Sequence, residues 1–230
     1  MSILKRTAAL TAIGVLLAGT AGAASLTTTF DLSGNDSSSA WNSLPSAVTM
    51  TQNGITATFD AKSWNNGPTG SGNVFTSGTV RDARLGRYNG GAGVTNSRRE
   101  SHVVDGYGWN DFIEIQFDAP HKVTEVSFGF YDRRDDFRWM YDSNEDGKIG
   151  VGDMFSDSIN VRSSNPFSGF GGVASNVFGI GAFGDNDSWK LRSVTVETSP
   201  VPLPAAGLLL LGGLGGLGMM GRRKATKTKA

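Results

Sequence analysis

Between residues 24 and 199, apolar and polar residues alternate in short runs that are separated by turn-forming residues. In the run Phe112–Phe117, Ile113 and Ile115 alternate with Glu114 and Gln116. Alternation with a period of two is typical of a β-strand with one buried face. Similar runs occur at Leu26–Leu32, Val48–Gln52, Ile55–Ala61, Val126–Phe130, Phe137–Tyr141, Ile159–Val161, Phe178–Ala182 and Val194–Val196. A sustained 3.6-residue apolar period is missing, so we expect few and short helices.

This spacing of strands predicts one all-β domain over residues 24–199, built as an antiparallel β-sandwich of jelly-roll-like type. Asn53 and Gly54 separate two of the runs, and this dipeptide favours a tight hairpin because both residues accept a positive φ. The segments 63–72 and 89–97 are rich in Gly and Asn, which predicts exposed loops.

Composition excludes several classes of protein. The chain has 230 residues with two His and no Cys, which rules out disulfides and a His/Cys zinc site. Two of the 21 basic residues precede residue 25 and five follow residue 200, which leaves 14 basic against 21 acidic residues between them. A body with a net charge of −7 is repelled by phosphate backbones, so we expect no nucleic-acid partner.

The first 23 residues have the layout of a secretory signal peptide. Lys5 and Arg6 precede an apolar stretch from Ala8 to Ala18, and the small residues Ala21-Gly22-Ala23 form a cleavage site. The alternative is a retained membrane anchor, for which this apolar stretch is short. We therefore predict export.

The C-terminal end combines a proline-rich motif, an apolar span and a basic cluster. The span covers residues 206–221, about 24 Å as a helix, and its Leu and Gly content suits a lipid environment. Arg222 and Arg223 follow it, so the positive-inside rule places the tail 222–230 in the cytoplasm. We expect a transmembrane helix here.

The motif Val201-Pro202-Leu203-Pro204-Ala205, followed by this span and by Arg222 and Arg223, is similar to the VPLPA variant of the PEP-CTERM sorting signal. The resemblance covers residues 200–224. It implies processing by an exosortase, an intramembrane enzyme of Gram-negative bacteria that make extracellular polysaccharide, and delivery to the cell surface or matrix. An ordinary C-terminal anchor shares every feature except the cleavage.

A twelve-residue loop from Asp142 to Asp153 carries the strongest chemical signal in the body. Oxygen-bearing side chains stand at loop positions one, three, five and twelve, and position seven offers a backbone carbonyl: Asp142, Asn144, Asp146, Asp153 and Lys148. Gly147 stands at the sharp turn of position six, and Ile149 is an apolar plug at position eight. This spacing predicts a calcium site, because a hard cation collects oxygens from a chain wound around it.

The loop resembles that of the EF-hand and more closely that of the bacterial dockerin, which also ends in Asp. Its flanks alternate with period two, so we expect a loop between strands in place of a helix–loop–helix. The alternative is an acidic hairpin loop that binds nothing. Three weaker groups could either complete a second calcium site or only form side-chain turns: Asp105, Asn110 and Asp111; Asp132, Asp135 and Asp136; and Asp185, Asn186 and Asp187.

Enzyme signatures are weak. Glu114 and Glu125 could be imagined as a glycosidase pair, but Glu114 falls on the polar face of its strand, where we expect solvent exposure. No G-x-S-x-G motif occurs, so we predict no catalytic residues. Trp64 and Trp109 stand in Gly/Asn-rich segments, where their rings could stack on sugars or could belong to the core.

These features together predict an exported, non-enzymatic calcium-binding protein of the cell surface or extracellular matrix. Two alternatives stay open. The first is a carbohydrate-binding module that acts on exopolysaccharide, and the second is a structural adhesin or biofilm-matrix subunit.

Overall fold

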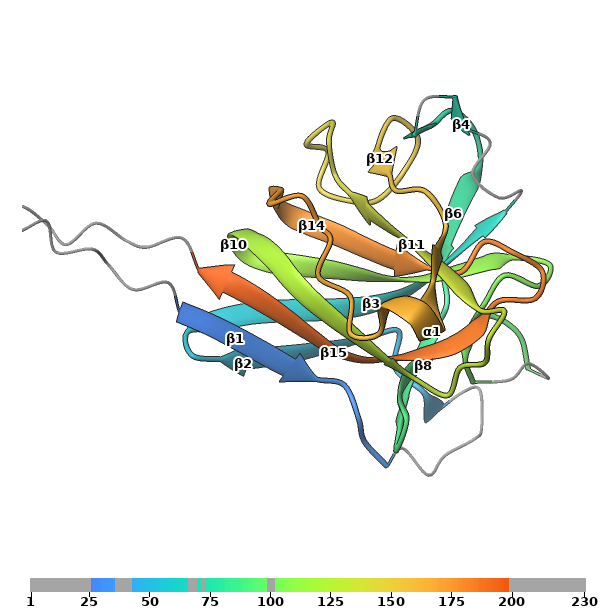
Figure 1. The fold of residues 1–230 in the computed structure, drawn as a ribbon, viewed down its shortest axis with the longest axis horizontal. Coiled ribbons are helices and arrows are strands. Elements are labelled where there is room, and N and C mark those ends of the chain that lie inside the picture. Colours follow the sequence, from blue (N-terminus) through green and yellow to red (C-terminus); the bar gives the residue numbers. More distant parts are fainter. Residues whose placement is uncertain (1–25, 36–42, 66–69, 72, 99–101, 199–230) are drawn as a thin grey trace, which may run out of the picture. The chain divides into compact units, whose positions relative to one another are not determined.

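Fifteen β-strands and one short helix make up the described part of the chain in a computed structural model (Figure 1). The structure describes residues 26–35, 43–65, 70–71, 73–98 and 102–198. The predicted signal peptide 1–23, the sorting signal 200–224 with its transmembrane helix 206–221, and the basic tail 222–230 lie outside these residues. Within them, no helix has the length and apolar character that a membrane crossing requires.

The elements have the following bounds. The strands are β1 (Leu26–Asp31), β2 (Ala47–Gln52), β3 (Ile55–Asn65), β4 (Gly70–Ser71), β5 (Val74–Phe75), β6 (Thr79–Asp82), β7 (Arg84–Tyr88), β8 (Gly91–Thr95), β9 (Val104–Asp105), β10 (Asn110–Gly129), β11 (Asp136–Tyr141), β12 (Met154–Phe155), β13 (Ile159–Asn160), β14 (Ala174–Gly181) and β15 (Ser188–Thr198). The helix is α1 (Val161–Ser164).

Every strand pairing is antiparallel, which confirms the all-β, antiparallel class. The described strands form one continuous sheet that curls on itself, with the path β4-β5-β12-β11-β14-β10-β15-β8-β7. The remaining strands pair with members of this path or, as β2 and β6 do, with β3. The sandwich arrangement and its jelly-roll likeness stay predictions. The hairpin between β2 and β3 is confirmed, with φ of 51° at Asn53 and 80° at Gly54.

Strand β10 belongs to both halves of the curled sheet, one of which contains β3 and β14 and the other β15. Its first part, Asn110–Phe117, pairs with β3 on one edge and β14 on the other. Its second part, Lys122–Gly129, pairs with β15. The sequence pattern predicted two strands here, but the structure has one, with an irregularity between Gln116 and His121. Pro120 falls in that irregularity, which is where a residue without an N–H group is tolerated within a sheet.

The two faces of the first part of β10 are both buried. Ile113 and Ile115 belong to the main core between the halves of the sheet, where Phe30 of β1 and Phe59 of β3 have ring centroids 5.8 Å apart. Phe112, on the opposite face, belongs to a second cluster. That cluster consists of Trp64, Phe75, Phe112, Met140, Ile149, Phe155 and Val177.

Two predicted loops are wrong in whole or in part. The segment 89–97 contains β8, whose five residues are all buried. Its glycines allow close approach of neighbouring backbone: a Cβ at Gly93 would lie 2.2 Å from the His102 carbonyl oxygen, and one at Gly91 would lie 2.5 Å from that of Leu191. Of the segment 63–72, the first three residues continue β3, and residues 66–69 and 72 lie outside the described residues.

The interpretation of Trp64 as an exposed sugar-stacking residue is wrong. Trp64 is 0% exposed, and its ring lies 4.4 Å from that of Phe75 between centroids. The reason is that β10 pairs with one edge of β3 at this point and β6 with the other, so the Trp64 side chain packs in the second cluster. Trp109 is partly exposed, but the Arg81 guanidinium covers its ring at 3.4 Å from the centroid.

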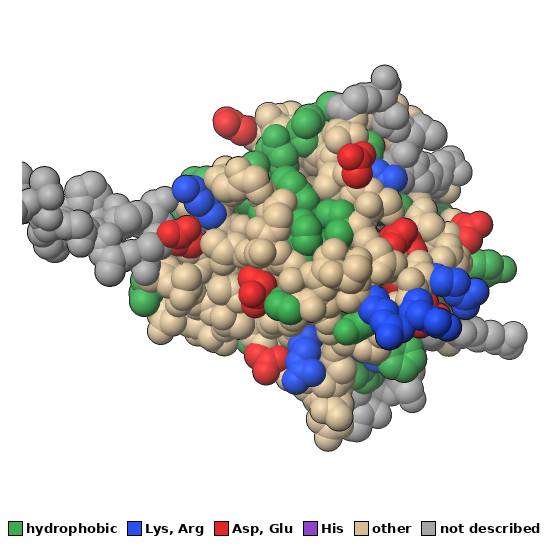
Figure 2. Space-filling model, viewed as in Figure 1, with side chains coloured by type: hydrophobic (Ala, Val, Ile, Leu, Met, Phe, Trp, Pro, Cys, Tyr) green, Lys and Arg blue, Asp and Glu red, His purple; other side chains and the backbone are tan. Residues whose placement is uncertain are grey.

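Exposed charge on the face seen in Figure 2 is mixed. Acidic side chains are spread over this face, and several Lys and Arg side chains gather close together toward its right-hand end. The net negative charge of the body therefore does not make this face uniformly negative.

We predict that Trp64→Ala lowers the free energy of unfolding by about 3–5 kcal/mol, because it removes a large buried ring and leaves a cavity. Trp109→Ala is the matched control and should cost about 1 kcal/mol or less, as expected for a partly exposed ring that stacks on Arg81. Urea unfolding followed by far-ultraviolet circular dichroism measures both. Equal costs for the two variants would contradict the placement of Trp64 in the core.

Candidate metal centre

The Asp142–Asp153 loop connects β11 to β12, as the period-two flanks predicted. Antiparallel pairing of Met140 with Phe155 and of Tyr141 with Met154 closes its base. The loop therefore starts and ends at neighbouring positions on a rigid sheet. Its twelve residues have to wind back on themselves within that span.

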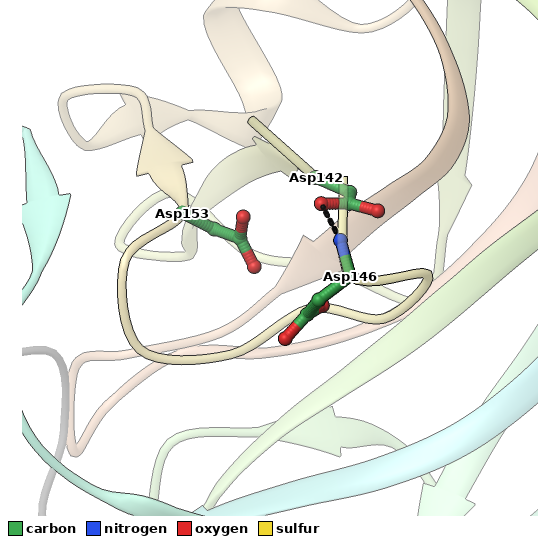
Figure 3. A group of neighbouring side chains, drawn as sticks. All are labelled: Asp142, Asp146 and Asp153. Carbon is green, nitrogen blue, oxygen red and sulfur yellow. Dashed lines mark hydrogen bonds between the residues drawn. The ribbon is translucent and has the colours of Figure 1, made fainter. Parts of the chain in front are cut away.

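Three carboxylates of the loop converge. Asp142, Asp146 and Asp153 each offer an oxygen, and these oxygens lie within 4.8 Å of one another (Figure 3). Calcium binds oxygens at about 2.3–2.6 Å, so ligands on opposite sides of the ion are up to about 5 Å apart. The separation of the three oxygens therefore fits an ion placed among them.

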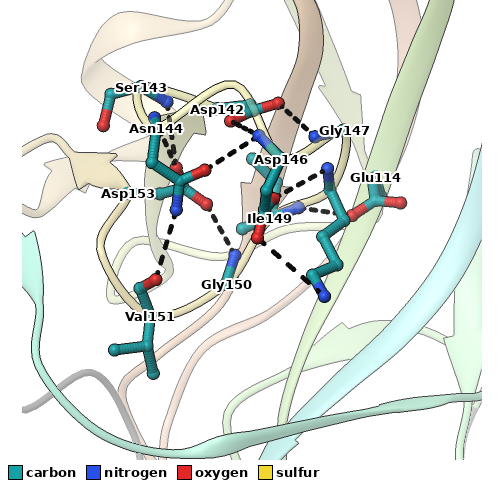
Figure 4. Close-up of polar contacts among 11 residues, drawn as sticks. Glu114, Asp142, Ser143, Asn144, Asp146, Gly147, Ile149, Gly150, Val151 and Asp153 are labelled. Carbon is teal, nitrogen blue, oxygen red and sulfur yellow. Dashed lines mark hydrogen bonds and ion pairs between the residues drawn. The ribbon is translucent and has the colours of Figure 1, made fainter.

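Backbone N–H groups hold the first half of the loop in this conformation (Figure 4). Asp142 accepts hydrogen bonds from Gly147 N, at 2.8 Å, and from Asp146 N, at 3.2 Å. Asn144 Oδ1 also accepts from Asp146 N, at 3.0 Å. Gly147 has a φ of 84°, a conformation that the sharp turn at position six requires and that favours glycine.

Asp153 ties the second half of the loop to the first. Its Oδ1 accepts from Ser143 N at 2.9 Å, and its Oδ2 accepts from Gly150 N at 2.7 Å. The residue is 0% exposed. Burial raises the pKa of the Asp153 carboxyl against the effect of these N–H groups, and the negative charge of Asp142 raises it further. A cation among the carboxylates would favour the charged form.

The other two predicted ligand positions belong to the same turn. Asn144 donates from Nδ2 to the Val151 carbonyl oxygen at 3.3 Å, which connects the two sides of the loop. Lys148 donates its backbone N–H to Asp146 Oδ1 at 3.3 Å, and its ammonium lies 3.9 Å from Asp146 Oδ2. The Lys148 ammonium is thus a positive charge within the loop itself. A cation bound to the Asp146 carboxylate would compete with this ion pair.

A buried glutamate that the sequence analysis placed in solvent anchors the loop. Ile149 N donates to Glu114 Oε2 at 2.7 Å, and Gln116 Nε2 donates to Glu114 Oε1 at 2.9 Å. Glu114 is 1% exposed, and burial raises the pKa of its carboxyl. The prediction of an exposed Glu114 is wrong because the loop, through Ile149, covers that face of β10. The apolar plug at position eight was the available signal that something packs there.

The weaker acidic groups bond to protein donors. Asp187 accepts from Asp136 N at 2.9 Å and from Gly184 N at 2.7 Å. Asp135 accepts from Ser188 N at 3.0 Å. The bond from Gly184 N closes a side-chain turn, as the alternative interpretation expected, whereas the bonds from Asp136 N and Ser188 N connect segments 51 and 53 residues apart and hold the fold together. Among the described residues, the loop trio is the one group of three His, Cys, Asp or Glu side chains with metal-binding spacing.

The Asp111 carboxylate shares this structural role, because its Oδ1 accepts from Ser63 Oγ at 2.5 Å and from Asn96 Nδ2 at 2.9 Å. Fold and site together thus define an all-β protein with an oxygen-lined candidate cation loop between β11 and β12. No family model, no curated protein and no solved structure matches this chain. Its function therefore has to be argued from its own residues.

We predict that Glu114→Ala lowers the free energy of unfolding by about 1–3 kcal/mol, because the buried Ile149 N–H loses its acceptor. Glu114→Gln keeps an amide oxygen for that N–H and should retain most of the stability. Urea unfolding in the presence of a chelator separates this anchoring from any effect of bound metal. A Gln variant as unstable as the Ala variant would show that the anchoring hydrogen bond is not what matters.

Proposed function

We propose that this chain is an exported, non-enzymatic calcium-binding protein of the cell surface or extracellular matrix. The observation that carries the calcium assignment is the convergence of Asp142, Asp146 and Asp153 within 4.8 Å, on a loop turned by Gly147 at a positive φ. Loop spacing and loop conformation both support the same ion.

The donor set favours calcium over other common metals. Carboxylate, amide and carbonyl oxygens suit hard cations, whereas zinc and copper sites use His or Cys, neither of which occurs in the loop. Magnesium requires near-ideal octahedral geometry and keeps several waters, while calcium accepts the irregular oxygen cage of a wound loop. Four acids against one lysine in twelve residues leave a net charge of −3, which a divalent cation offsets.

The titratable groups outside the loop support a non-enzymatic role. Both oxygens of Glu114 accept hydrogen bonds from protein donors, and its side chain is buried. His102 Nδ1 lies 2.8 Å from Thr95 Oγ1, and its ring stacks on Tyr88 with centroids 5.3 Å apart. These contacts give Glu114 and His102 a role in holding the fold together, which is the basis for proposing a non-enzymatic protein.

The two ends of the chain support export and surface delivery. In this proposal, residues 1–23 direct secretion, the 206–221 helix holds the protein in the membrane, and an exosortase-type enzyme processes the Val201–Ala205 motif. The curled sheet then acts as a sandwich-like body of jelly-roll type outside the cell. Export suits a calcium site, because extracellular calcium-binding modules work at 10⁻⁴–10⁻³ M affinities.

We predict that calcium raises the melting temperature of the full chain and that Asp142→Ala/Asp146→Ala abolishes this rise. At calcium one hundred times its dissociation constant, binding adds about 2.7 kcal/mol. For a body of this size that is a shift of roughly 5–10 °C. Differential scanning fluorimetry in detergent, with calcium or EDTA, measures it.

Asp157→Ala is the matched control for this experiment. Asp157 is an exposed aspartate four residues beyond the loop. Its replacement removes one negative charge, as each loop substitution does, and should leave the calcium response intact. A wild type that melts at the same temperature in calcium and in EDTA would overturn the calcium assignment. Magnesium at the same concentration should produce a smaller shift.

We predict that Pro202→Ala/Pro204→Ala blocks processing of the tail in the producing bacterium. Wild-type protein should leave the membrane fraction with a mass that lacks the C-terminal residues, and the variant should stay in the membrane at a higher mass. Lys227→Ala/Lys229→Ala, beyond the basic cluster, is the control and should behave as wild type. Intact mass and immunoblotting of cell fractions measure this, and wild type that keeps its full mass would indicate an ordinary anchor.

A further inference from the structure

A second candidate site lies at the opposite end of β11 from the metal loop. β11 runs from Asp136 to Tyr141, and the metal loop follows its last residue. Directly before its first residue lies a cavity of about 350 Å³. It is lined by Phe130, Tyr131, Asp132, Asp135, Asn186 and Ser188.

Phe130 is exposed at an energetic cost to the backbone. Its side chain is 69% exposed, and its φ of 52° lies in the left-handed region that bulky residues avoid. Neither burial nor local conformation favours phenylalanine here, because solvent exposure forfeits the hydrophobic stabilisation that a buried ring provides. Strain of this kind is concentrated at functional sites, where it aims a side chain.

Lys190 fixes one side of the Phe130 ring. Its Nζ lies 5.5 Å from the Phe130 centroid and 4.0 Å from that of Tyr88, within the range of cation–π contacts. Tyr131, which is 38% exposed, follows Phe130 in the cavity wall. Two neighbouring aromatic side chains, Phe130 and Tyr131, thus lie at the surface. The Lys190 ammonium contacts the ring of Phe130.

The polar side of the cavity carries two carboxylates and one amide, from Asp132, Asp135 and Asn186. Asp132 accepts from Arg134 N at 2.6 Å and forms an ion pair with the Arg134 guanidinium at 3.6 Å. Asp135 is buried and accepts N–H groups of Asp132 and Ser188. Asn186 donates from Nδ2 to the Arg134 carbonyl oxygen at 3.1 Å. These bonds hold carboxylate and amide groups in place beside the aromatic rings.

We propose that this cavity binds a pyranose unit of a neutral polysaccharide. An aromatic ring offers an apolar face on which the C–H face of a sugar stacks, and fixed carboxylate and amide groups accept its hydroxyls. The carboxylates disfavour an anionic sugar. A cavity of about 350 Å³ is at the small end of ligand pockets and suits one or two sugar rings.

This inference does not depend on the calcium proposal. Six strand residues separate the two sites, which is about 20 Å. Sugar binding should therefore persist in EDTA below the melting temperature. Calcium binding without sugar binding would overturn only this inference. Sugar binding without calcium binding would overturn only the calcium proposal.

The test is titration calorimetry of the full chain in detergent with a panel of hexasaccharides. The neutral probes are hexamers of glucose in α-1,4 and β-1,4 linkage, of mannose, of xylose and of N-acetylglucosamine, and the anionic probe is a galacturonate hexamer. We expect at least one neutral hexamer to bind more tightly than the anionic one. Binding to none of the neutral probes, or only to the anionic one, overturns the proposal.

Variants separate a binding role of Phe130 from a structural one. Phe130→Gly should weaken binding by at least about tenfold while the melting temperature stays unchanged or rises, because glycine adopts a positive φ without strain. Tyr131→Ala should also weaken it. Tyr107→Ala is the control, since Tyr107 is 77% exposed but does not line the cavity. A Phe130→Gly variant that binds as wild type, or that melts well below it, overturns the proposal.

Discussion

The pairing of β10 is the constraint on which the rest of the structure depends. Its first part lies between β3 and β14, and its second part pairs with β15, so one strand belongs to both halves of the curled sheet. Because Ile113 and Ile115 face the main core, Phe112 and Glu114 project to the other side. That second face also has to be covered, and the β11–β12 loop covers it.

The loop therefore serves both packing and charge. Ile149 packs in the second cluster and gives its N–H to Glu114, while the carboxylates of Asp142, Asp146 and Asp153 gather on the other side of the same short turn. Burial raises the pKa of Glu114 and of Asp153, because it disfavours their charged forms. A cation bound at the loop, as proposed, would favour the charged form of Asp153.

The tryptophans and the aromatic residues of the turn after β10 differ in exposure. Trp64 and Trp189 are fully buried, and Trp109 lies under Arg81. Phe130 is largely exposed and Tyr131 partly exposed, both line a cavity, and Phe130 has a positive φ. Trp64, which its place in a Gly/Asn-rich segment favoured for sugar stacking, thus stabilises the fold, and the exposed rings beside the cavity come from the turn that follows β10.

The sequence by itself determined the all-β class, the Asn53-Gly54 hairpin and the placement of the Asp142–Asp153 loop between strands, because period-two alternation and turn chemistry are local properties. Only the tertiary structure decided that Glu114 and Trp64 are buried, that the glycines of residues 91–95 form a strand, and that Phe130 is exposed. Each of these depends on which distant segment covers the residue. A local pattern cannot contain that information, since it is set by pairing across the curled sheet.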